Sequence, residues 1–223
     1  MTDLAANYHA VKKEADAAGA TLVAVSKTQP VARIRELYDL GHRDFGENRV
    51  TELLEKKEAL PKDINWHFIG HLQRNKVKQI ADFVHLIHAV DSPRLLREID
   101  KQGQRANRAV PVLLQYHVAE EAAKYGLDPE QPTRLFEEVD PRELPGVSVN
   151  GVMGMATYTD DDEQISAEFD RLAATYRLLK NRYFQDVEGF REVSMGMSGD
   201  YPLALDRGST LIRVGSLLFG RRK

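Results

Sequence analysis

Hydrophobic and polar positions along the chain follow two alternating periods. Short apolar runs rich in β-branched residues indicate buried strands, and segments with apolar residues three or four positions apart indicate helices. The predicted strands are 21–27, 44–48, 65–70, 83–89, 110–118, 149–155, 192–195 and 211–214. The predicted helices are 3–18, 30–40, 49–59, 75–81, 94–102, 132–139, 162–182 and 199–206. A helix thus precedes the first strand, and one helix lies between each strand and the next.

This alternation is the pattern of parallel βα units. No linker or shift in composition divides the chain, so we expect residues 1–223 to form a single domain. Eight short units favour one closed (β/α)8 TIM barrel with an extra N-terminal helix. An open doubly wound sheet fits the same alternation and is the alternative. In a barrel, we expect the functional site at the carboxyl ends of the strands.

Composition narrows the class of protein. A hydrophobic fraction of 42% and a charged fraction of 29% are typical of a soluble globular chain. The net charge of -3 gives no reason to expect a nucleic acid or an anionic membrane as partner. The absence of cysteine excludes disulfides, thiol catalysis and thiolate metal sites. Residues 1–20 lack the apolar core of a signal peptide, so we expect a cytoplasmic protein, and nothing indicates an obligate interface, so we expect a monomer.

A lysine ends the first predicted strand. Alternate side chains of a strand share a face, so Val23, Val25 and Lys27 are expected on one side. Burying an amine there is costly unless it has a use, such as forming a Schiff base. The alternative is a lysine whose stem is covered while its amine reaches solvent, and the strand taken alone favours that alternative. In a barrel, Lys27 would lie at the end where chemistry takes place.

Two glycine-containing segments follow the seventh and eighth predicted strands. Ser198 lies within residues 195–200, just before a short predicted helix, and Gly215 and Ser216 follow the eighth strand. Backbone N–H groups and a serine hydroxyl there could bind an anion, and barrels often bind phosphate at these two strand ends. The alternative is that the glycines merely turn the chain.

Arg213 precedes Gly215 by two positions, so both are expected on the same side of the strand. A guanidinium near a phosphate-binding loop could pair with a phosphate, a carboxylate or a ring nitrogen. The structural alternative is a salt bridge to a carboxylate at a strand end, such as Glu47.

Histidines and acidic residues give weaker signals. His67 and His71 lie on either side of the end of a predicted strand. The two are therefore not expected to bind the same metal ion, and no metal site is predicted. His85 and His88 lie in an apolar strand and are interpreted as core or rim residues. The acidic run 160–163 begins the predicted helix 162–182, where the helix dipole favours negative charge.

Five blocks of sequence carry a family resemblance. They are Ala24–Thr28, Phe45–Asn48, Trp66–Lys76, Ser194–Ser198, and Gly208–Thr210 with Arg213–Gly215 and Phe219–Gly220. Together, in this order, they resemble the pyridoxal-phosphate homeostasis family, which is itself similar to the barrel domain of bacterial alanine racemase.

The resemblance implies a pyridoxal 5'-phosphate (PLP) site. Lys27 would carry the cofactor as a Schiff base, and Arg213 would face its pyridine nitrogen. The residues implied for the rest of the pocket are Ser198, Gly215 and Ser216 at the phosphate and Asn48 near the ring.

The same resemblance implies binding without efficient catalysis. An arginine holds its proton and leaves the pyridine nitrogen unprotonated, which makes the cofactor a poor electron sink. Racemases with this feature use a second base, a tyrosine from an added domain. The sequence ends at Lys223, directly after the eighth unit, and nothing places Tyr158 or Tyr201 across the ring from Lys27.

We therefore expect a cofactor carrier in intracellular PLP homeostasis. PLP-dependent apo-enzymes or vitamin B6 salvage enzymes are the partners that the resemblance implies. The alternatives are a PLP-dependent amino-acid racemase and an aldolase that uses Lys27 on a phosphorylated sugar.

The chain departs from the family pattern in places. Arg49 stands where a tyrosine is common, and Thr51 replaces a usual glutamine. Gly154 and Thr157 stand where threonine and proline are common. The changes at Arg49 and Thr51 are expected to affect the rim of the pocket and any exchange partner, not cofactor attachment.

Overall fold

The computed structural model describes residues 3–120 and 125–220 and forms a closed barrel in which the strands pair in sequence order. The strands are β1 (Thr21–Val25), β2 (Asp44–Glu47), β3 (Asn65–Phe68), β4 (Leu86–Val90), β5 (Val110–Gln115), β6 (Val147–Met153), β7 (Glu192–Ser194) and β8 (Leu211–Val214). β8 pairs in parallel with β1, where Leu22 lies opposite Ile212 and Val23 opposite Arg213. This pairing closes the ring, so the TIM barrel is confirmed and the open sheet is excluded.

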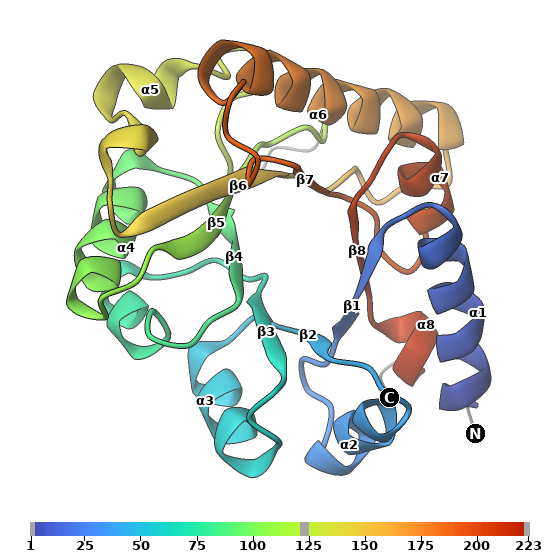
Figure 1. Cartoon of the computed structure of the whole chain (residues 1–223). Helices are drawn as coiled ribbons and strands as arrows, with labels where there is room; N and C mark the ends of the chain where they lie inside the picture. Colours follow the sequence, from blue (N-terminus) through green and yellow to red (C-terminus); the bar gives the residue numbers. More distant parts are fainter. Residues whose placement is uncertain (1–2, 121–124, 221–223) are drawn as a thin grey trace.

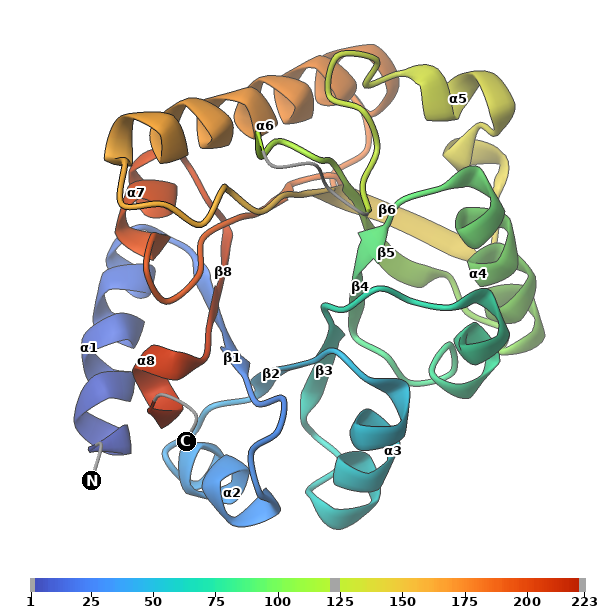
Figure 2. The same ribbon diagram turned by 180° about the vertical axis from the view of Figure 1, so that it is seen from behind.

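Helices surround the ring of strands, as Figure 1 and the reverse view in Figure 2 show. The α-helices are α1 (Leu4–Ala17), α2 (Val31–Asp39), α3 (Val50–Ala59), α4 (Pro93–Arg105), α5 (Arg134–Glu138), α6 (Asp162–Tyr183), α7 (Tyr201–Asp206) and α8 (Ser216–Phe219). Two 3-10 helices, η1 (Arg74–Gln79) and η2 (Pro141–Glu143), complete the described elements. The expected N-terminal helix is confirmed as α1, which lies beside α8 (Figure 1).

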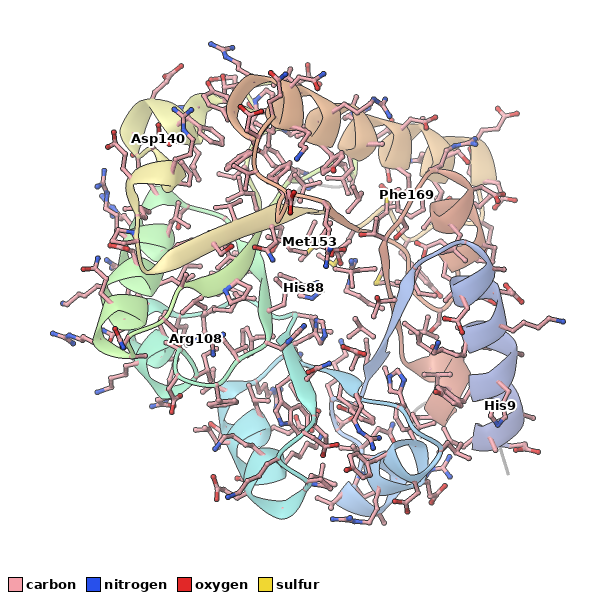
Figure 3. All side chains as sticks on the ribbon, viewed as in Figure 1. His9, His88, Arg108, Asp140, Met153 and Phe169 are labelled. Atoms are coloured by element: carbon pink, nitrogen blue, oxygen red, sulfur yellow. The ribbon has the colours of Figure 1, made fainter. Side chains whose placement is uncertain are left out.

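Both faces of the sheet are buried. Leu22 belongs to the large core between strands and helices, whereas its neighbour Val23 belongs to a small cluster inside the barrel. Figure 3 shows Met153 and His88 within the ring of strands, with Phe169 of α6 among the surrounding helices. Burial on both faces explains why the strands are almost continuously apolar in sequence.

Several element boundaries differ from the sequence predictions. β1 ends at Val25, two residues early, because a turn follows in which the Gln29 N–H bonds to the Ser26 carbonyl. Thr28 in this turn has a φ of 66°, which no extended strand can contain. β4 begins at Leu86, the basic segment after β3 is the 3-10 helix η1, and α8 was not predicted. No helix in the described ranges is long and apolar enough to cross a membrane.

Candidate functional site

A cavity of about 920 Å³ lies at the carboxyl ends of the strands. Its wall contains all six residues predicted for the site, namely Lys27, Asn48, Ser198, Arg213, Gly215 and Ser216. They come from the segments after β1, β2 and β7 and from β8 with the segment that follows it. Barrel closure therefore brings together the residues that the sequence predicted separately.

Lys27 is half-buried in the turn after β1. Val25 and Lys27 both line the cavity, which agrees with their expected position on one side of the strand. Helix α3 holds the turn on both sides of the lysine. The Thr28 N–H donates to Glu52 Oε1 at 2.5 Å, and Lys56 Nζ donates to the Ser26 carbonyl at 2.7 Å. These two bonds fix the backbone that carries Lys27.

A buried ionic network lies behind this turn, on the helix side of the sheet. Glu47 Oε1 accepts from Lys56 Nζ at 2.7 Å and from Ser26 Oγ at 2.6 Å, and Lys56 also donates to Glu52 at 2.6 Å. Burial raises the pKa of Glu47, although both hydrogen bonds oppose that rise. Burial also tends to raise the pKa of Glu52, but the bonds from Lys56 and Thr28 outweigh it and lower that pKa. Sequence reasoning missed this network.

Arg213 is only 4% exposed and points into the barrel from β8. Nη1 donates to Ser194 Oγ at 2.6 Å, and Nη2 donates to the Gly154 carbonyl at 3.0 Å. Burial lowers the pKa of Arg213 to about 10, with Asp200 opposing the shift, so the guanidinium is protonated at neutral pH. The proposed salt bridge between Arg213 and Glu47 is wrong, because Glu47 pairs with Lys56 instead.

The segments after β7 and β8 meet at Ser198. Its Oγ accepts from the Gly215 N–H at 3.1 Å and from the Leu217 N–H at 3.3 Å. Gly215 packs tightly against β1, since an added Cβ would lie 3.2 Å from the Val25 carbonyl oxygen. Ser216 is exposed at the mouth of the cavity. Hydroxyl and backbone N–H groups thus gather where a barrel commonly binds phosphate.

The sequence departures lie in different surroundings. Arg49 and Thr51 line a separate hollow beside Glu52 and are not among the residues that line the main cavity, so their expected effect on its rim stays a prediction. Thr157 lines the cavity, and its N–H and hydroxyl both donate to Glu168. A proline at position 157 could not make the first of these bonds.

Tyr158 and Tyr201, the tyrosines named in the sequence analysis, lie in different places. Tyr158 lines the cavity but is 98% exposed. Tyr201 is buried outside the cavity wall, where burial and a hydrogen bond to Glu14 raise its pKa to about 12. A third tyrosine, Tyr125, lines the cavity and stacks on His71 with ring centres 4.0 Å apart.

His67 and His71 occupy different places. His71 lines the cavity and pairs with Asp91 at 3.3 Å, whereas His67 is buried inside the barrel. Donor atoms of Asp44, His67 and His85 lie within 4.8 Å of one another, and they are of the types that bind divalent metals. A hydrogen bond between His67 Nε2 and Asp44 Oδ1, 3.1 Å long, accounts for the approach of two of them.

Comparisons with known proteins agree with this architecture. Residues 1–223 match the family model described as alanine racemase, N-terminal domain. A pyridoxal phosphate homeostasis protein of Aquifex aeolicus is 42% identical over 92% of this chain and 88% of its own length. A second, from Pseudomonas aeruginosa, is 38% identical over 93% of this chain and 86% of its own.

Solved structures of PipY from Synechococcus elongatus are also similar. The structure without PLP has a TM-score of 0.89 and the structure with PLP bound has 0.85, each at 33% identity and covering 98% of this chain and all of PipY. The similarity therefore extends along the whole barrel. The chain belongs to the alanine racemase N-terminal domain family and, within it, to the pyridoxal phosphate homeostasis proteins.

Proposed function

We propose that this protein binds PLP in the cavity at the carboxyl ends of the strands, as a Schiff base on Lys27, and acts in PLP homeostasis without efficient catalysis. One observation carries the proposal: Lys27, the buried Arg213 and the serine-containing segments after β7 and β8 all line a single cavity. The name of the relatives and the PLP-bound PipY support the choice of ligand.

The residues present suit this cofactor. The cavity volume of about 920 Å³ falls in the range of small-molecule sites. Ser198 and Ser216 offer hydroxyls, and Gly215 lies between them in the same wall. Arg213 presents a buried cation in the same wall. The donor set therefore matches a molecule with a phosphate at one end and a carbonyl that reacts with an amine.

Each residue has a distinct task in this proposal. Lys27 supplies the amine that holds the cofactor, on a turn fixed by Glu52 and Lys56. Ser198 and Ser216 bind the phosphate with the backbone at Gly215, and Asn48 lies beside the ring. Bound PLP supplies an electron-withdrawing ring, whose strength as an electron sink depends on protonation of its nitrogen. Arg213 remains protonated at neutral pH and would donate a hydrogen bond to that nitrogen without transferring a proton.

The racemase alternative needs a second base facing the ligand. Tyr158 lines the cavity but is 98% exposed, so the surrounding protein does little to hold its hydroxyl in place. A loosely held base is a poor proton donor or acceptor in catalysis. Exchange of the α-proton of an amino acid with solvent at enzymatic rates would favour a racemase over a carrier.

An absorbance spectrum of the purified protein with added PLP tests the proposal. We expect wild type and Lys13→Ala, which changes an exposed lysine on α1, to show the band of lysine-bound PLP. Lys27→Ala should lose this band while remaining folded. Borohydride reduction followed by peptide mass spectrometry should place the cofactor on Lys27.

A band that survives in Lys27→Ala would refute the attachment. Borohydride trapping with a sugar phosphate, in a protein that takes up no PLP, would point to the aldolase alternative. The proposal also includes a cytoplasmic monomer that delivers PLP to PLP-dependent apo-enzymes or vitamin B6 salvage enzymes. Size-exclusion chromatography tests the monomer, and cofactor transfer to a purified apo-enzyme tests the delivery of PLP.

A further inference from the structure

A chain of four hydrogen bonds runs through the interior of the barrel from Arg213. Arg213 Nη1 lies 2.6 Å from Ser194 Oγ, which lies 2.9 Å from His88 Nδ1. His88 Nε2 lies 3.0 Å from His67 Nδ1, and His67 Nε2 lies 3.1 Å from Asp44 Oδ1. β4, which carries His88, and β7, which carries Ser194, are not neighbours in the sheet, so this bond crosses the lumen. Figure 3 shows His88 inside the ring of strands.

Counting donors and acceptors shows in which direction the four hydrogen bonds are donated. A guanidinium can only donate and a carboxylate can only accept; Ser194 brings one proton, and each histidine ring brings one when it is neutral. With both rings neutral, the four bonds need four protons, and each is supplied only if every donor points from Arg213 toward Asp44. His67 and His88 must then both carry their proton on Nε2. Burial lowers the pKa of His88 well below its usual value, which keeps this ring neutral.

The two residues at the ends of this series of hydrogen bonds, Arg213 and Asp44, are charged. Arg213 is buried, and no carboxylate of the described residues forms a salt bridge with it. Burial alone would raise the pKa of Asp44, but bonds from His67 and Asn65 outweigh it and lower that pKa. A buried cation without a carboxylate in contact is costly, and aligned O–H and N–H dipoles between a cation and an anion stabilise both.

We propose that Asp44 is a positioning residue for Arg213 and acts on it through His67, His88 and Ser194. The part of this proposal that concerns the ligand rests on the proposed function, in which Arg213 faces the pyridine nitrogen. Asp44, His67 and His88 do not line the cavity, so they have no direct route to a ligand there. Ser194 Oγ and the Gly154 carbonyl hold two of the five guanidinium N–H groups, and the orientation of the others follows from them.

The first test uses the protein without cofactor. Nitrogen-15 NMR of the histidine rings should show His67 and His88 as Nε2–H tautomers. The side-chain N–H groups of Arg213 should exchange slowly with solvent, and Asp44→Asn, which keeps the shape and removes the charge, should speed this exchange about tenfold. An Nδ1–H tautomer at either histidine, or unchanged Arg213 exchange in Asp44→Asn, would overturn the proposal.

The second test measures PLP affinity and the absorbance maximum of bound PLP. Asp44→Asn should weaken PLP binding about fivefold or more and shift the absorbance, which is a coupling of ordinary size between linked sites. Ser194→Ala should do the same and replaces Asp44→Asn if that variant does not fold. Thr175→Val is the matched control, since Thr175 is a buried residue whose hydroxyl bonds only within α6. Affinity within twofold of wild type in both test variants would overturn the proposal.

Failure of the proposed function can be told apart from failure of the Asp44 proposal. A wild-type chain that binds no PLP refutes the function, and the tautomers and Arg213 exchange still decide whether Asp44 positions the guanidinium.

Discussion

Replacing Lys56 by methionine removes one charge from the buried network behind Lys27. Methionine keeps most of the side-chain length and volume, so the change isolates the ammonium group. The Lys56 side chain is 6% exposed and that of Glu47 is fully buried. In Lys56→Met, Glu47 therefore becomes a buried carboxylate without its cation, and the Ser26 carbonyl and Glu52 lose the same donor.

Breaking a buried ion pair by removing one partner costs about 3–5 kcal/mol. We expect a loss of this size in the free energy of unfolding near neutral pH. Domain stabilities are about 5–15 kcal/mol, so the variant should fold but unfold at much lower denaturant concentration. Removing both charges in Glu47→Gln/Lys56→Met should recover most of the loss, because the fully buried position 47 then carries no charge. Lys57→Met is the control, since the ion pair of Lys57 is with the exposed Glu58 and its ammonium also lies 4.7 Å from the centre of the Phe83 ring.

The loss should depend on pH in a definite direction. The pKa of Glu47 is raised in the folded protein, so folding favours the protonated carboxyl. Its contribution is complete below the unfolded pKa and disappears as pH rises through the folded pKa. Without Lys56 the folded pKa of Glu47 rises further, at about 1.4 kcal/mol per unit. The deficit of Lys56→Met should therefore be smallest in acid and should grow as pH rises.

Urea unfolding followed by circular dichroism, at about pH 5 and about pH 8, measures both effects. A deficit below about 1 kcal/mol at the higher pH would refute the assignment of Lys56 as the buried partner of Glu47. An equal deficit at both pH values would refute the titration argument. PLP binding should weaken in the same variant, because Lys56 also holds the Ser26 carbonyl beside Lys27.

Two further predictions concern the segment after β8 and the start of helix α6. Gly215→Ala should cost about 1–3 kcal/mol of stability and should also weaken PLP binding, because its Cβ would lie 3.2 Å from the Val25 carbonyl oxygen. Urea unfolding equal to wild type would contradict the close packing there. Asp161→Ala should cost about 1 kcal/mol of stability, because the Asp161 side chain caps α6 by accepting from the N–H groups of Glu163 and Gln164. PLP affinity should stay the same in that variant, and urea unfolding equal to wild type would show that the cap contributes nothing.

The architecture was largely predictable from local pattern. Apolar runs and helical periodicity record which face of each segment is buried, and their alternation is compatible with few folds. The acidic run 160–163 also predicted the helix start correctly, since Asp161 caps α6. The ends of elements were less accurate. Thr28, just after the end of β1, has a left-handed backbone conformation. Glycine is the usual sequence signal for that conformation, and none stands there.

The sequence by itself placed Lys27, Arg213 and the two loops after β7 and β8 at strand ends, and a barrel puts such ends around one opening. The tertiary structure alone decided which polar groups hold them. His88 and Ser194 are 106 residues apart, and Glu47 and Lys56 lie on a strand and a helix that only packing brings into contact. Periodicity encodes the face on which a side chain lies, but a hydrogen-bond partner across the lumen depends on how the whole barrel closes.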